Sequence, residues 1–360
     1  MSNKLKVLVV GCGNMGASHA RAYHKIEDFE LVGLVSRKPD SRLKLSDELG
    51  GVADFSSYEE ALKTTRPHVV SINTYPDTHA AYAEMALNAG AHVFIEKPLA
   101  LTVEEAQRIV DLAMQKNRKM VVGYILRVHP AWAKFVETAR TLGKPLVMRM
   151  NLNQQSSGST WATHKQLMNS MSPIVDCGVH YVDIMCLMTQ ANPIRVSAIG
   201  ARLTDEIAPD MYNYGMLQVS FDDGSVGWYE AGWGPMISET AFFVKDVIGP
   251  NGCVSIVDEA GGERADESDD IDGHTKTGFL KLHHSATNEK GDFIQKDEYI
   301  DTSEEPDHDG LCELEQRYLL QAIKEDIDLS LHLRDAVNSL RIVIAADESY
   351  KTGKTVDLNG

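Results

Sequence analysis

Two short segments, far apart in the chain, carry side chains that could act together as a base and a cation. Glu96-Lys97-Pro98 closes an apolar, strand-like run, and the segment 176–183 has His180 between two aspartates. Residues three, four and seven apart stack along a helix, so Asp176, His180 and Asp183 are predicted to share one helix face. Oxidising a secondary alcohol needs a base for the hydroxyl proton and a cation beside the developing alkoxide. His180 and Lys97 could supply these two functions.

Each of these residues also has a structural interpretation. His180 could be a core histidine, but polar residues aligned on an otherwise apolar segment are costly to bury without a purpose. Lys97 could be an ordinary surface lysine, yet it follows a predicted parallel strand at its carboxyl end, where ligands of such sheets bind. Glu96 could hold its turn or contact a cofactor, and Asp183 could be a hydrogen-bond acceptor within the fold. For Glu96 and Asp183 the structural role is favoured.

A glycine-rich turn near the N-terminus predicts a dinucleotide site. Gly11-Cys12-Gly13-Asn14-Met15-Gly16 follows the apolar run 5–10 and opens a helical pattern. Glycines let the backbone approach a pyrophosphate, and the N–H groups of the following helix point at the anion. The pattern alone also fits a tight turn, but its place between a strand and a helix favours dinucleotide binding. The predicted cofactor contacts are Gly11, Gly13, Asn14, Met15 and Gly16.

The end of the second predicted strand bears on the choice between NAD and NADP. NAD enzymes usually place a carboxylate here for the ribose 2′-hydroxyl, whereas this chain has Ser36-Arg37-Lys38. A hydroxyl and two cations suit a 2′-phosphate, so NADP is slightly favoured. Alternatively, Arg37 and Lys38 are solvated loop charges and Arg37 stacks on the adenine.

The elements that must position these residues alternate in type through the first third of the chain. Strands are expected at 5–10, 31–35, 68–72, 92–95 and 119–124, and helices at 15–25, 41–49, 78–89 and 103–116. Such βα repetition builds a parallel, doubly wound sheet of the Rossmann type. The first domain is therefore predicted to span residues 1–125.

The pattern changes after residue 125. Helices are expected at 130–141 and 174–189, and alternating strands at 146–154, 195–203, 212–221 and 226–230, with a hairpin turn at 222–225. Two further helices are expected at 311–325 and 333–350. The overall prediction is an α/β protein in which a second α/β domain, residues 126–360, has a large, open, mostly antiparallel sheet.

Composition narrows the class of partner. The formal charge of -17 over 360 residues argues against nucleic acid or an anionic membrane, because both attract basic surfaces. No apolar run reaches a membrane-spanning length and no signal-peptide core follows Met1, so a cytoplasmic protein is expected. The five cysteines are scattered without a Cys-x-x-Cys pair, which favours buried free thiols.

The motifs taken together resemble the glucose–fructose oxidoreductase and inositol dehydrogenase (Gfo/Idh/MocA) family. The resemblance rests on the glycine turn, the stretch 73–79, Glu96-Lys97-Pro98, Gly123-Tyr124 with Arg127 and Pro130, and the Asp-x-Gly-x-His-x-x-Asp segment, in order along the chain. It implies a nicotinamide-dependent oxidation or reduction of a sugar or cyclitol. By position it implies that Lys97, Asp176 and His180 are catalytic, and that Thr74, Pro76, His79, Glu96 and Lys97 contact the cofactor. The chain departs from the family at 169–173, which replaces a run of glycines, so the substrate cannot be taken from a known member.

Several further residues could hold a polyhydroxylated ring. Hydroxyl-binding and ring-stacking candidates are Tyr124, Arg127, Trp161, His164, Tyr229 and Trp233, although packing is the default role of each tryptophan. No metal is predicted: His283 and His284 are adjacent and point differently, and the acidic stretch 258–272 lacks a calcium-loop glutamate where Phe279 stands.

Three functions fit these observations. The favoured one is an NAD(P)-dependent dehydrogenase or reductase acting on a sugar or cyclitol. The alternatives are a hydrolase or lyase that oxidises a sugar transiently with bound cofactor, and a cofactor-binding regulator without turnover, against which the intact Lys97, Asp176 and His180 argue. A homodimer or homotetramer is also predicted, because one face of the second sheet would otherwise lack cover. The sequence does not identify the sugar, the carbon oxidised or the physiological direction.

Overall fold

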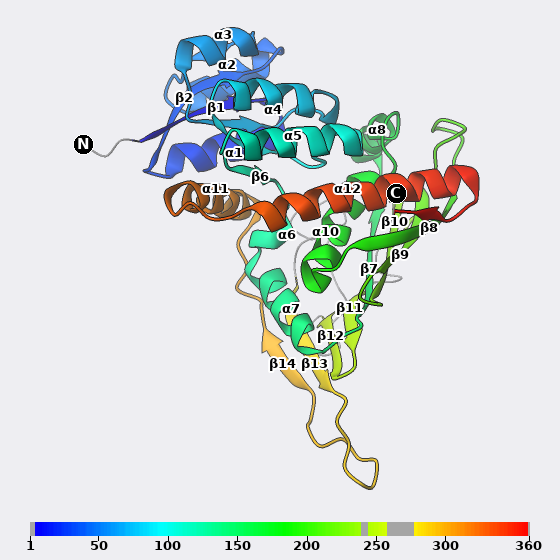
Figure 1. Ribbon diagram of the computed structural model, residues 1–360. Helices are drawn as coiled ribbons and strands as arrows, with labels where there is room; N and C mark the ends of the chain where they lie inside the picture. The colour runs from blue at the N-terminus through cyan, green and yellow to red at the C-terminus, as the bar shows by residue number, and fades with distance from the viewer. Residues whose placement is uncertain (1–3, 239–243, 258–276, 359–360) are drawn as a thin grey trace. The chain divides into compact units, whose positions relative to one another are not determined.

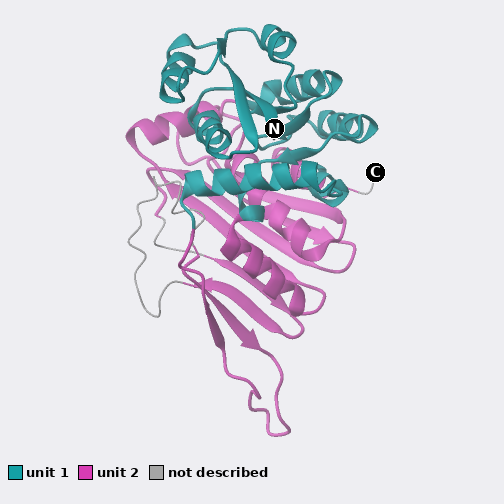
Figure 2. Ribbon diagram, turned by 90° about the vertical axis from the view of Figure 1, so that its left-hand side faces the viewer, with its two compact units in different colours: residues 1–128, 306–337 teal, residues 129–305, 338–360 magenta. Residues whose placement is uncertain are grey.

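The computed structural model describes residues 4–238, 244–257 and 277–358. The chain divides into two compact units: residues 1–128 with 306–337, and residues 129–305 with 338–360 (Figure 2). The first boundary lies close to the predicted one at 125. Residues 306–337 belong to the first unit, whereas the sequence placed everything after 125 in the second domain.

The first unit is built on a six-stranded parallel sheet with the order β3-β2-β1-β4-β5-β6 (Figure 1). The strand order reverses at β1, because the chain first adds β2 and β3 on one side and then β4 to β6 on the other. Ligands of such sheets bind at the carboxyl ends of the strands beside this reversal. The strands are β1 Leu5–Val10, β2 Phe29–Val35, β3 Asp54–Phe55, β4 Val69–Ile72, β5 His92–Ile95 and β6 Met120–Val122.

Helices cover both faces of this sheet, so the central strands are apolar on both sides; Val7, Leu8, Val9 and Val10 are all buried. The helix α1 packs against α11, and α4 packs against α5. Side chains cap two of the helices: Ser57 accepts from the Glu60 N–H, and Thr102 from the Glu105 N–H. The helices are α1 Asn14–Lys25, α2 Pro39–Glu48, α3 Tyr58–Thr65, η1 Pro76–Thr78, α4 His79–Asn88, α5 Val103–Gln115, α6 Ile125–Val128 and α11 His308–Lys324, with residues 330–337 of α12 Ser330–Thr352.

The second unit is built on a nine-stranded sheet with the order β14-β13-β12-β11-β7-β10-β9-β8-β15. Every pair is antiparallel except β7 and β10, which run parallel. The strands are β7 Val147–Gln155, β8 Pro193–Ala201, β9 Tyr214–Phe221, β10 Val226–Gly234, β11 Lys245–Gly249, β12 Gly252–Val257, β13 Phe279–His284, β14 Glu298–Asp301 and β15 Val356–Asp357.

One face of the second sheet carries the helices. A Cβ at Gly227 would lie 2.6 Å from Met185 Sδ, and a Cβ at Gly178 would lie 2.8 Å from the Tyr229 ring, so the helix and sheet backbones approach closely at these two glycines. The helices of this unit are α7 Pro130–Thr141, α8 Gly158–Leu167, α9 Pro173–Asp176 and α10 Gly178–Thr189, with residues 338–352 of α12.

The structure differs from the sequence prediction in several elements, and the strands β11 to β15 were not predicted. The predicted helix 174–189 is interrupted at Cys177, which separates α9 from α10. The helices α3 and α8 were not predicted, and β3 consists of two residues, too short to give a periodic signal. The acidic stretch 258–272, for which no calcium site was predicted, lies outside the described residues.

Candidate active site

The glycine turn follows the carboxyl end of β1 and packs against Asn73, the residue after β4. A Cβ at Gly11 would lie 2.3 Å from the Asn73 carbonyl oxygen, and a Cβ at Gly16 would lie 1.8 Å from the Gly11 carbonyl oxygen. Gly11 also has a positive φ of 95°. A Cβ at Gly13 would meet no atom, so the turn is open at the position where a pyrophosphate would approach. These residues fit a dinucleotide, and Asn14 and Met15 begin α1 at the same place.

The end of β2 presents the predicted 2′-phosphate residues to solvent. The side chains of Arg37 and Lys38 are exposed, and the Lys38 backbone N–H donates to Ser36 Oγ over 3.3 Å. Arg42, which sequence reasoning did not select, donates to Asp54 Oδ1 over 2.6 Å and to the Ser36 carbonyl over 3.2 Å. Its charge is therefore already balanced, whereas Arg37 and Lys38 are exposed.

His79 begins α4, after the loop that follows β4, and is fully buried. Its Nδ1 lies 2.8 Å from the Pro98 carbonyl oxygen and its Nε2 lies 3.0 Å from the Thr74 carbonyl oxygen. Burial lowers the pKa of His79, and a neutral imidazole can donate to only one of the two carbonyls. His79 thus ties the loop after β4 to the loop after β5. Thr74 shares a 2.7 Å hydrogen bond with Thr78, and Pro76 begins η1.

Lys97 follows β5 at the same edge of the parallel sheet. The preceding Glu96 is buried, and its Oε2 accepts from the Lys97 backbone N–H over 3.2 Å. The other oxygen of Glu96 lies 2.7 Å from Nε2 of His19, a fully buried residue of α1 that sequence reasoning missed. His19 belongs to no sequence motif that indicates this contact.

Tyr124 and Arg127, predicted to bind substrate, lie at the end of the first unit's sheet and contact α12. Tyr124 is buried and packs edge-on to His332, with ring centroids 6.4 Å apart. Arg127 Nη2 donates to Asp335 Oδ2 over 3.0 Å, and both side chains are largely buried. These contacts anchor α12 to the first unit, and a substrate role for either residue stays a prediction.

The Asp-x-Gly-x-His segment lies in the second unit, across the junction of α9 and α10. Asp176 ends α9 and His180 lies in the first turn of α10; both are half-buried, whereas Asp183 is fully buried. The half-buried Cys177 between them places its Sγ 3.6 Å from Asp176 Oδ2 and 3.4 Å from Gln154 Oε1. Asp176 and His180 therefore combine partial exposure with fixed backbone, as an acid–base pair requires.

A set of polar and aromatic side chains surrounds Gln154 on the helix-bearing face of the second sheet. Trp233 Nε1 donates to Gln154 Oε1 over 2.6 Å, and the His164 ring stacks on Trp233 with centroids 4.3 Å apart and an interplanar angle of 8°. His164 Nδ1 lies 3.0 Å from Ser156 Oγ. Gln154 and Ser156 were not selected from the sequence. The signal for Gln154 was its place in line with Met148 and Met150, at inward-facing positions of a strand.

The remaining aromatic candidates are packed in this unit. Trp161 is buried with Met168, Ile207 and Trp233 in one apolar cluster. Tyr229 is fully buried and stacks on Tyr181, with centroids 4.9 Å apart, and burial raises its pKa well above the ordinary value. A direct substrate contact by Trp161 stays a prediction.

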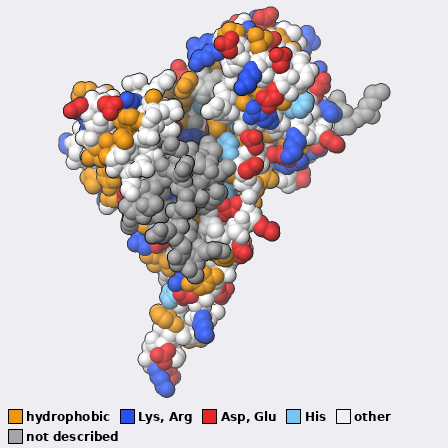
Figure 3. All heavy atoms as spheres, turned by 180° about the vertical axis from the view of Figure 1, so that it is seen from behind, with side chains coloured by type: hydrophobic (Ala, Val, Ile, Leu, Met, Phe, Trp, Pro, Cys, Tyr) orange, Lys and Arg blue, Asp and Glu red, His pale blue; other side chains and the backbone are white. Residues whose placement is uncertain are grey.

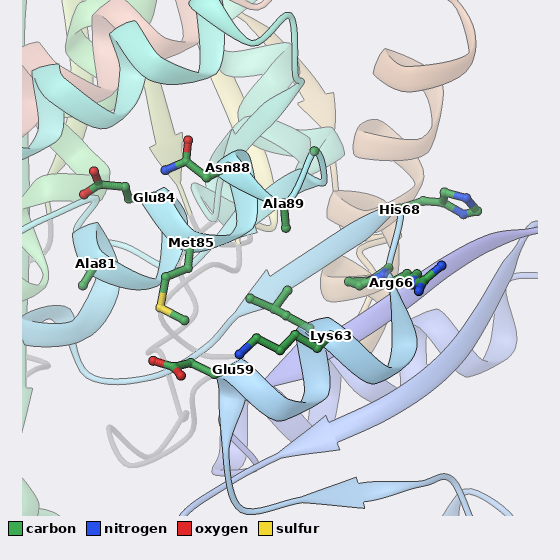
Figure 4. A pocket seen from close by; sticks show the side chains of 12 residues that line it. Glu59, Lys63, Arg66, His68, Ala81, Glu84, Met85, Asn88 and Ala89 are labelled. Atoms are coloured by element: carbon green, nitrogen blue, oxygen red, sulfur yellow. The ribbon is translucent and has the colours of Figure 1, made fainter.

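A groove of about 1120 Å³ lies away from these side chains, between α3 and α4 of the first unit (Figure 4). Glu59, Lys63 and Arg66 line one side, and Met85 and Asn88 line the other. The groove lies toward the amino-terminal ends of the parallel strands, because His68 immediately precedes β4. Ligands of such sheets bind at the opposite edge, so the groove is not part of the candidate site.

Two adjacent histidines of β13 each lie beside a different carboxylate. His283 lies 2.8 Å from Asp297 Oδ1 and His284 lies 2.7 Å from Glu298 Oε1, so each binds its own carboxylate. On the face drawn in Figure 3, basic and acidic side chains are interspersed. Within residues 4–238, 244–257 and 277–358, no helix is long and apolar enough to cross a membrane.

Comparison with known families assigns both parts of the chain. The family model described as "Oxidoreductase family, NAD-binding Rossmann fold" matches residues 5–124, and the "GFO/IDH/MocA C-terminal domain" matches residues 133–242. The chain belongs to the Gfo/Idh/MocA family. Its first unit is the NAD-binding Rossmann fold of that family, which confirms the resemblance and the predicted fold class.

Relatives in the Gfo/Idh/MocA family include several dehydrogenases. The chain is 32% identical over 199 residues to UDP-N-acetylglucosamine 3-dehydrogenase of Acidithiobacillus ferrooxidans, covering 55% of this chain and 59% of the relative. It is 24% identical to scyllo-inositol 2-dehydrogenase (NAD(+)) of Bacillus subtilis, covering 100% and 98%. The matches to the first three curated relatives span between 53% and 61% of those proteins' lengths.

Solved structures share the fold. The structure of scyllo-inositol dehydrogenase from Lactobacillus casei with bound NAD(H) and scyllo-inositol matches with a TM-score of 0.75 and 20% identity, covering 99% of this chain and 100% of that one. This likeness extends over both units and establishes the architecture of the whole chain.

Proposed function

We propose that this protein is an NAD(P)-dependent oxidoreductase that transfers hydride between a nicotinamide cofactor and a secondary alcohol of a sugar or cyclitol. The observation that carries the proposal is the position of Lys97. It follows β5 at the carboxyl edge of a parallel sheet whose β1 ends in a glycine turn open to a pyrophosphate. The dehydrogenases of inositol and UDP-N-acetylglucosamine among its relatives support this substrate class.

The residues of the chain have distinct tasks in this proposal. Gly11, Gly13 and Gly16 let the backbone and the start of α1 hold the cofactor pyrophosphate. The nicotinamide, when bound, accepts or returns the hydride. His180 takes the hydroxyl proton, Asp176 keeps it oriented and stabilises its protonated form, and Lys97 stabilises the developing alkoxide.

Two finer features belong to the same proposal. The exposed Arg37 and Lys38 after β2 favour NADP over NAD, because both can form charge-assisted hydrogen bonds to a 2′-phosphate. The protein is also proposed to be a homo-oligomer. On the sheet face opposite α10, Ile248, Val147 and Val226 are register partners across β11, β7 and β10, and they are 37%, 36% and 41% exposed. An exposed apolar row of this kind suits a second copy of the chain.

A substrate panel tests the proposed activity. Purified protein is incubated with myo-inositol, scyllo-inositol, glucose, a methyl glucoside and UDP-N-acetylglucosamine, each with NAD and with NADP, while nicotinamide reduction is followed by absorbance. Reduction with at least one compound is expected, and it should be lost in Lys97→Ala and in His180→Ala. Turnover unaffected by either substitution would remove the role given to that residue.

A further inference from the structure

A buried polar chain connects α11 to the backbone of Lys97 through His19. His19 lies in α1 with no exposed surface, its Nδ1 lies 2.9 Å from the Gln316 amide nitrogen, and its Nε2 lies 2.7 Å from Glu96 Oε1. Glu96 Oε2 in turn accepts from the Lys97 N–H over 3.2 Å. All four residues belong to the first unit. His19 therefore contacts Lys97 only through Glu96 in this chain of hydrogen bonds.

The hydrogen bonds fix the tautomer of His19. In the amide orientation that the structure gives Gln316, its nitrogen donates to Nδ1 of His19, so Nδ1 accepts and the ring proton lies on Nε2. Nε2–H then donates to the Glu96 carboxylate. The ring is also held laterally by Phe94, with centroids 4.6 Å apart. This tautomer satisfies both hydrogen-bonding neighbours of His19.

Both the backbone and the side chain of Glu96 are fixed by neighbouring groups. Its backbone N–H donates to the Ile72 carbonyl over 2.9 Å, which fixes the end of β5 against β4. A Cβ at Gly123, the residue after β6, would lie 3.3 Å from Glu96 Oε2, so the backbone there also approaches the carboxylate. A carboxylate with both oxygens engaged cannot rotate without breaking a hydrogen bond, and the adjoining turn is fixed with it.

A second buried carboxyl, that of Glu315, interacts with Glu96. Glu315 of α11 is 2% exposed, and burial, followed by the charge of Glu96, raises its pKa well above the ordinary value. Two carboxylates close together in a buried region cannot both ionise. Burial therefore favours the protonated form of Glu315, whereas Glu96 accepts hydrogen bonds from His19 and from the Lys97 backbone.

The same residues argue against a metal site here. One ligand atom each from His19, Cys312 and Glu315 lie within 4.8 Å of one another. A metal would need a free histidine nitrogen and deprotonated ligands. Both nitrogens of His19 already have partners, and burial raises the pKa of the Cys312 thiol.

We propose that His19 is a positioning residue for Lys97, acting through Glu96, with Gln316 selecting its tautomer. The proposal rests on the function proposed for Lys97 above. A side chain that must meet a developing alkoxide needs a fixed turn, because a misplacement of about 1 Å can cost about 10²-fold in rate.

Three variants separate the bond from the bulk of the ring. His19→Leu removes the donor to Glu96, whereas His19→Gln can return an amide N–H to the place of Nε2. Glu96→Gln keeps the shape of the acceptor without its charge. His24→Leu, which changes an exposed histidine of the same helix, is the control.

With the panel compound that gives the highest wild-type rate, His19→Leu should lower kcat about 10-fold or more at saturating cofactor, and the kcat of His19→Gln should lie between those of His19→Leu and wild type. The NADPH dissociation constant, measured by fluorescence, should stay near wild type.

A double-mutant cycle shows whether His19 acts through Lys97. In the Lys97→Ala background, His19→Leu should cause no further loss of kcat, because the group that it positions is gone. Losses that multiply would show that His19 acts elsewhere and would overturn the proposal.

Two measurements do not depend on turnover. Trace acetylation with acetic anhydride, read by mass spectrometry against the exposed Lys63, should show a raised reactivity of Lys97 in His19→Leu and a value close to wild type in His19→Gln. Nitrogen-15 spectra of the wild type should show His19 protonated on Nε2; a proton on Nδ1 with a bare Nε2 would contradict the proposal. If acetylation of Lys97 changes in His19→Leu but Lys97→Ala turns over normally, His19 positions Lys97 and the proposed function is refuted. If acetylation and kcat of His19→Leu stay at the wild-type values while Lys97→Ala is inactive, the proposed function stands and the positioning role of His19 is refuted.

Discussion

Trp233 and Gln154 are register partners in the parallel pair β7 and β10, and the indole Nε1 of Trp233 donates to Gln154 Oε1 over 2.6 Å. Cys177, between Asp176 and the helix of His180, contacts the same Gln154 oxygen at 3.4 Å. Gln154 therefore connects β10 to the segment 176–180, which carries the proposed base. It also holds the Trp233 ring against His164, which stacks on it.

The first prediction follows from this pair. Trp233→Phe keeps an aromatic ring beside His164 but removes the N–H donor to Gln154. We expect KM for the polyol to rise on the order of 10-fold, because a displaced Gln154 costs about 1–3 kcal/mol of hydrogen bonding. Steady-state kinetics measure KM, and urea unfolding measures the free energy of unfolding of the variant.

Trp132→Phe is the matched control, since Trp132 is equally buried in the second unit. It should lower the free energy of unfolding and leave KM unchanged. A KM for Trp233→Phe that stays at the wild-type value would show that Gln154 does not shape the substrate site.

The second prediction concerns the cofactor. If Arg37 and Lys38 bind a 2′-phosphate, NADPH should bind more tightly than NADH by about 1.5–3 kcal/mol. The double variant Arg37→Ser with Lys38→Ala should lose this preference, whereas Lys63→Ala, which removes an exposed lysine of α3, should retain it. Fluorescence titration with both cofactors decides, and equal affinities in the wild type would leave NAD as the physiological partner.

The third prediction is a pH dependence of stability from Glu315. Burial raises the pKa of this carboxyl in the folded state, so the folded protein keeps a proton that the unfolded chain releases above pH ~4.3. Stability is therefore lost as pH rises from there toward the folded pKa, by at most about 1.4 kcal/mol per pH unit. Glu315→Gln should remove this loss, so its stability relative to wild type should grow between pH 5 and pH 8 in urea titrations.

Glu313 on the same helix is a control, because its pKa is lowered rather than raised. Its hydrogen bond to Lys25, followed by that to Arg317, lowers the pKa of this carboxyl. Its contribution is present above the unfolded pKa and is lost as pH falls through the folded value. Glu313→Gln should therefore show no growing advantage between pH 5 and pH 8, and identical pH profiles for the two variants would contradict a raised pKa of Glu315.

Much of the first unit was predictable because its elements have strong local signals. The strand 5–10 and the helix that follows it were predicted with bounds within a residue of those observed, since an apolar run and a glycine turn mark both ends. The role of residues 306–337 was not predictable. Their helical pattern indicates α11 but not which sheet it covers, because that depends on packing between segments distant in sequence.

The candidate site could be proposed from the sequence where chemistry is concentrated in a short segment, as at Lys97 and at Asp176 with His180, whose roles stay predictions. It was not predictable where a polar side chain acts through another. His19 and Gln316 lie 297 residues apart and meet at 2.9 Å, and neither belongs to a motif that indicates the contact. The interruption at Cys177 was not predicted, although Gly178, which follows it, is a weak helix former.

The fourth prediction concerns assembly. If the row of Ile248, Val147 and Val226 is covered by a second copy, Val147→Glu should place a charge in the interface and dissociate the oligomer. Met114→Lys, which changes a 59% exposed side chain of α5, should leave the assembly intact. Light scattering at micromolar concentration measures both. A monomeric wild type would contradict the proposed oligomer.

The most direct test of the proposed function is the transfer of a labelled hydride. The protein is incubated with the panel compound that reduces the cofactor, prepared with deuterium on its ring carbons, and the reduced nicotinamide is isolated and analysed by mass spectrometry and proton NMR. The proposal predicts one deuterium at C4 of the nicotinamide, in amounts equal to the ketone formed, and no such product with Lys97→Ala. Reduced cofactor without deuterium, or no reduction with any sugar or cyclitol, would contradict it.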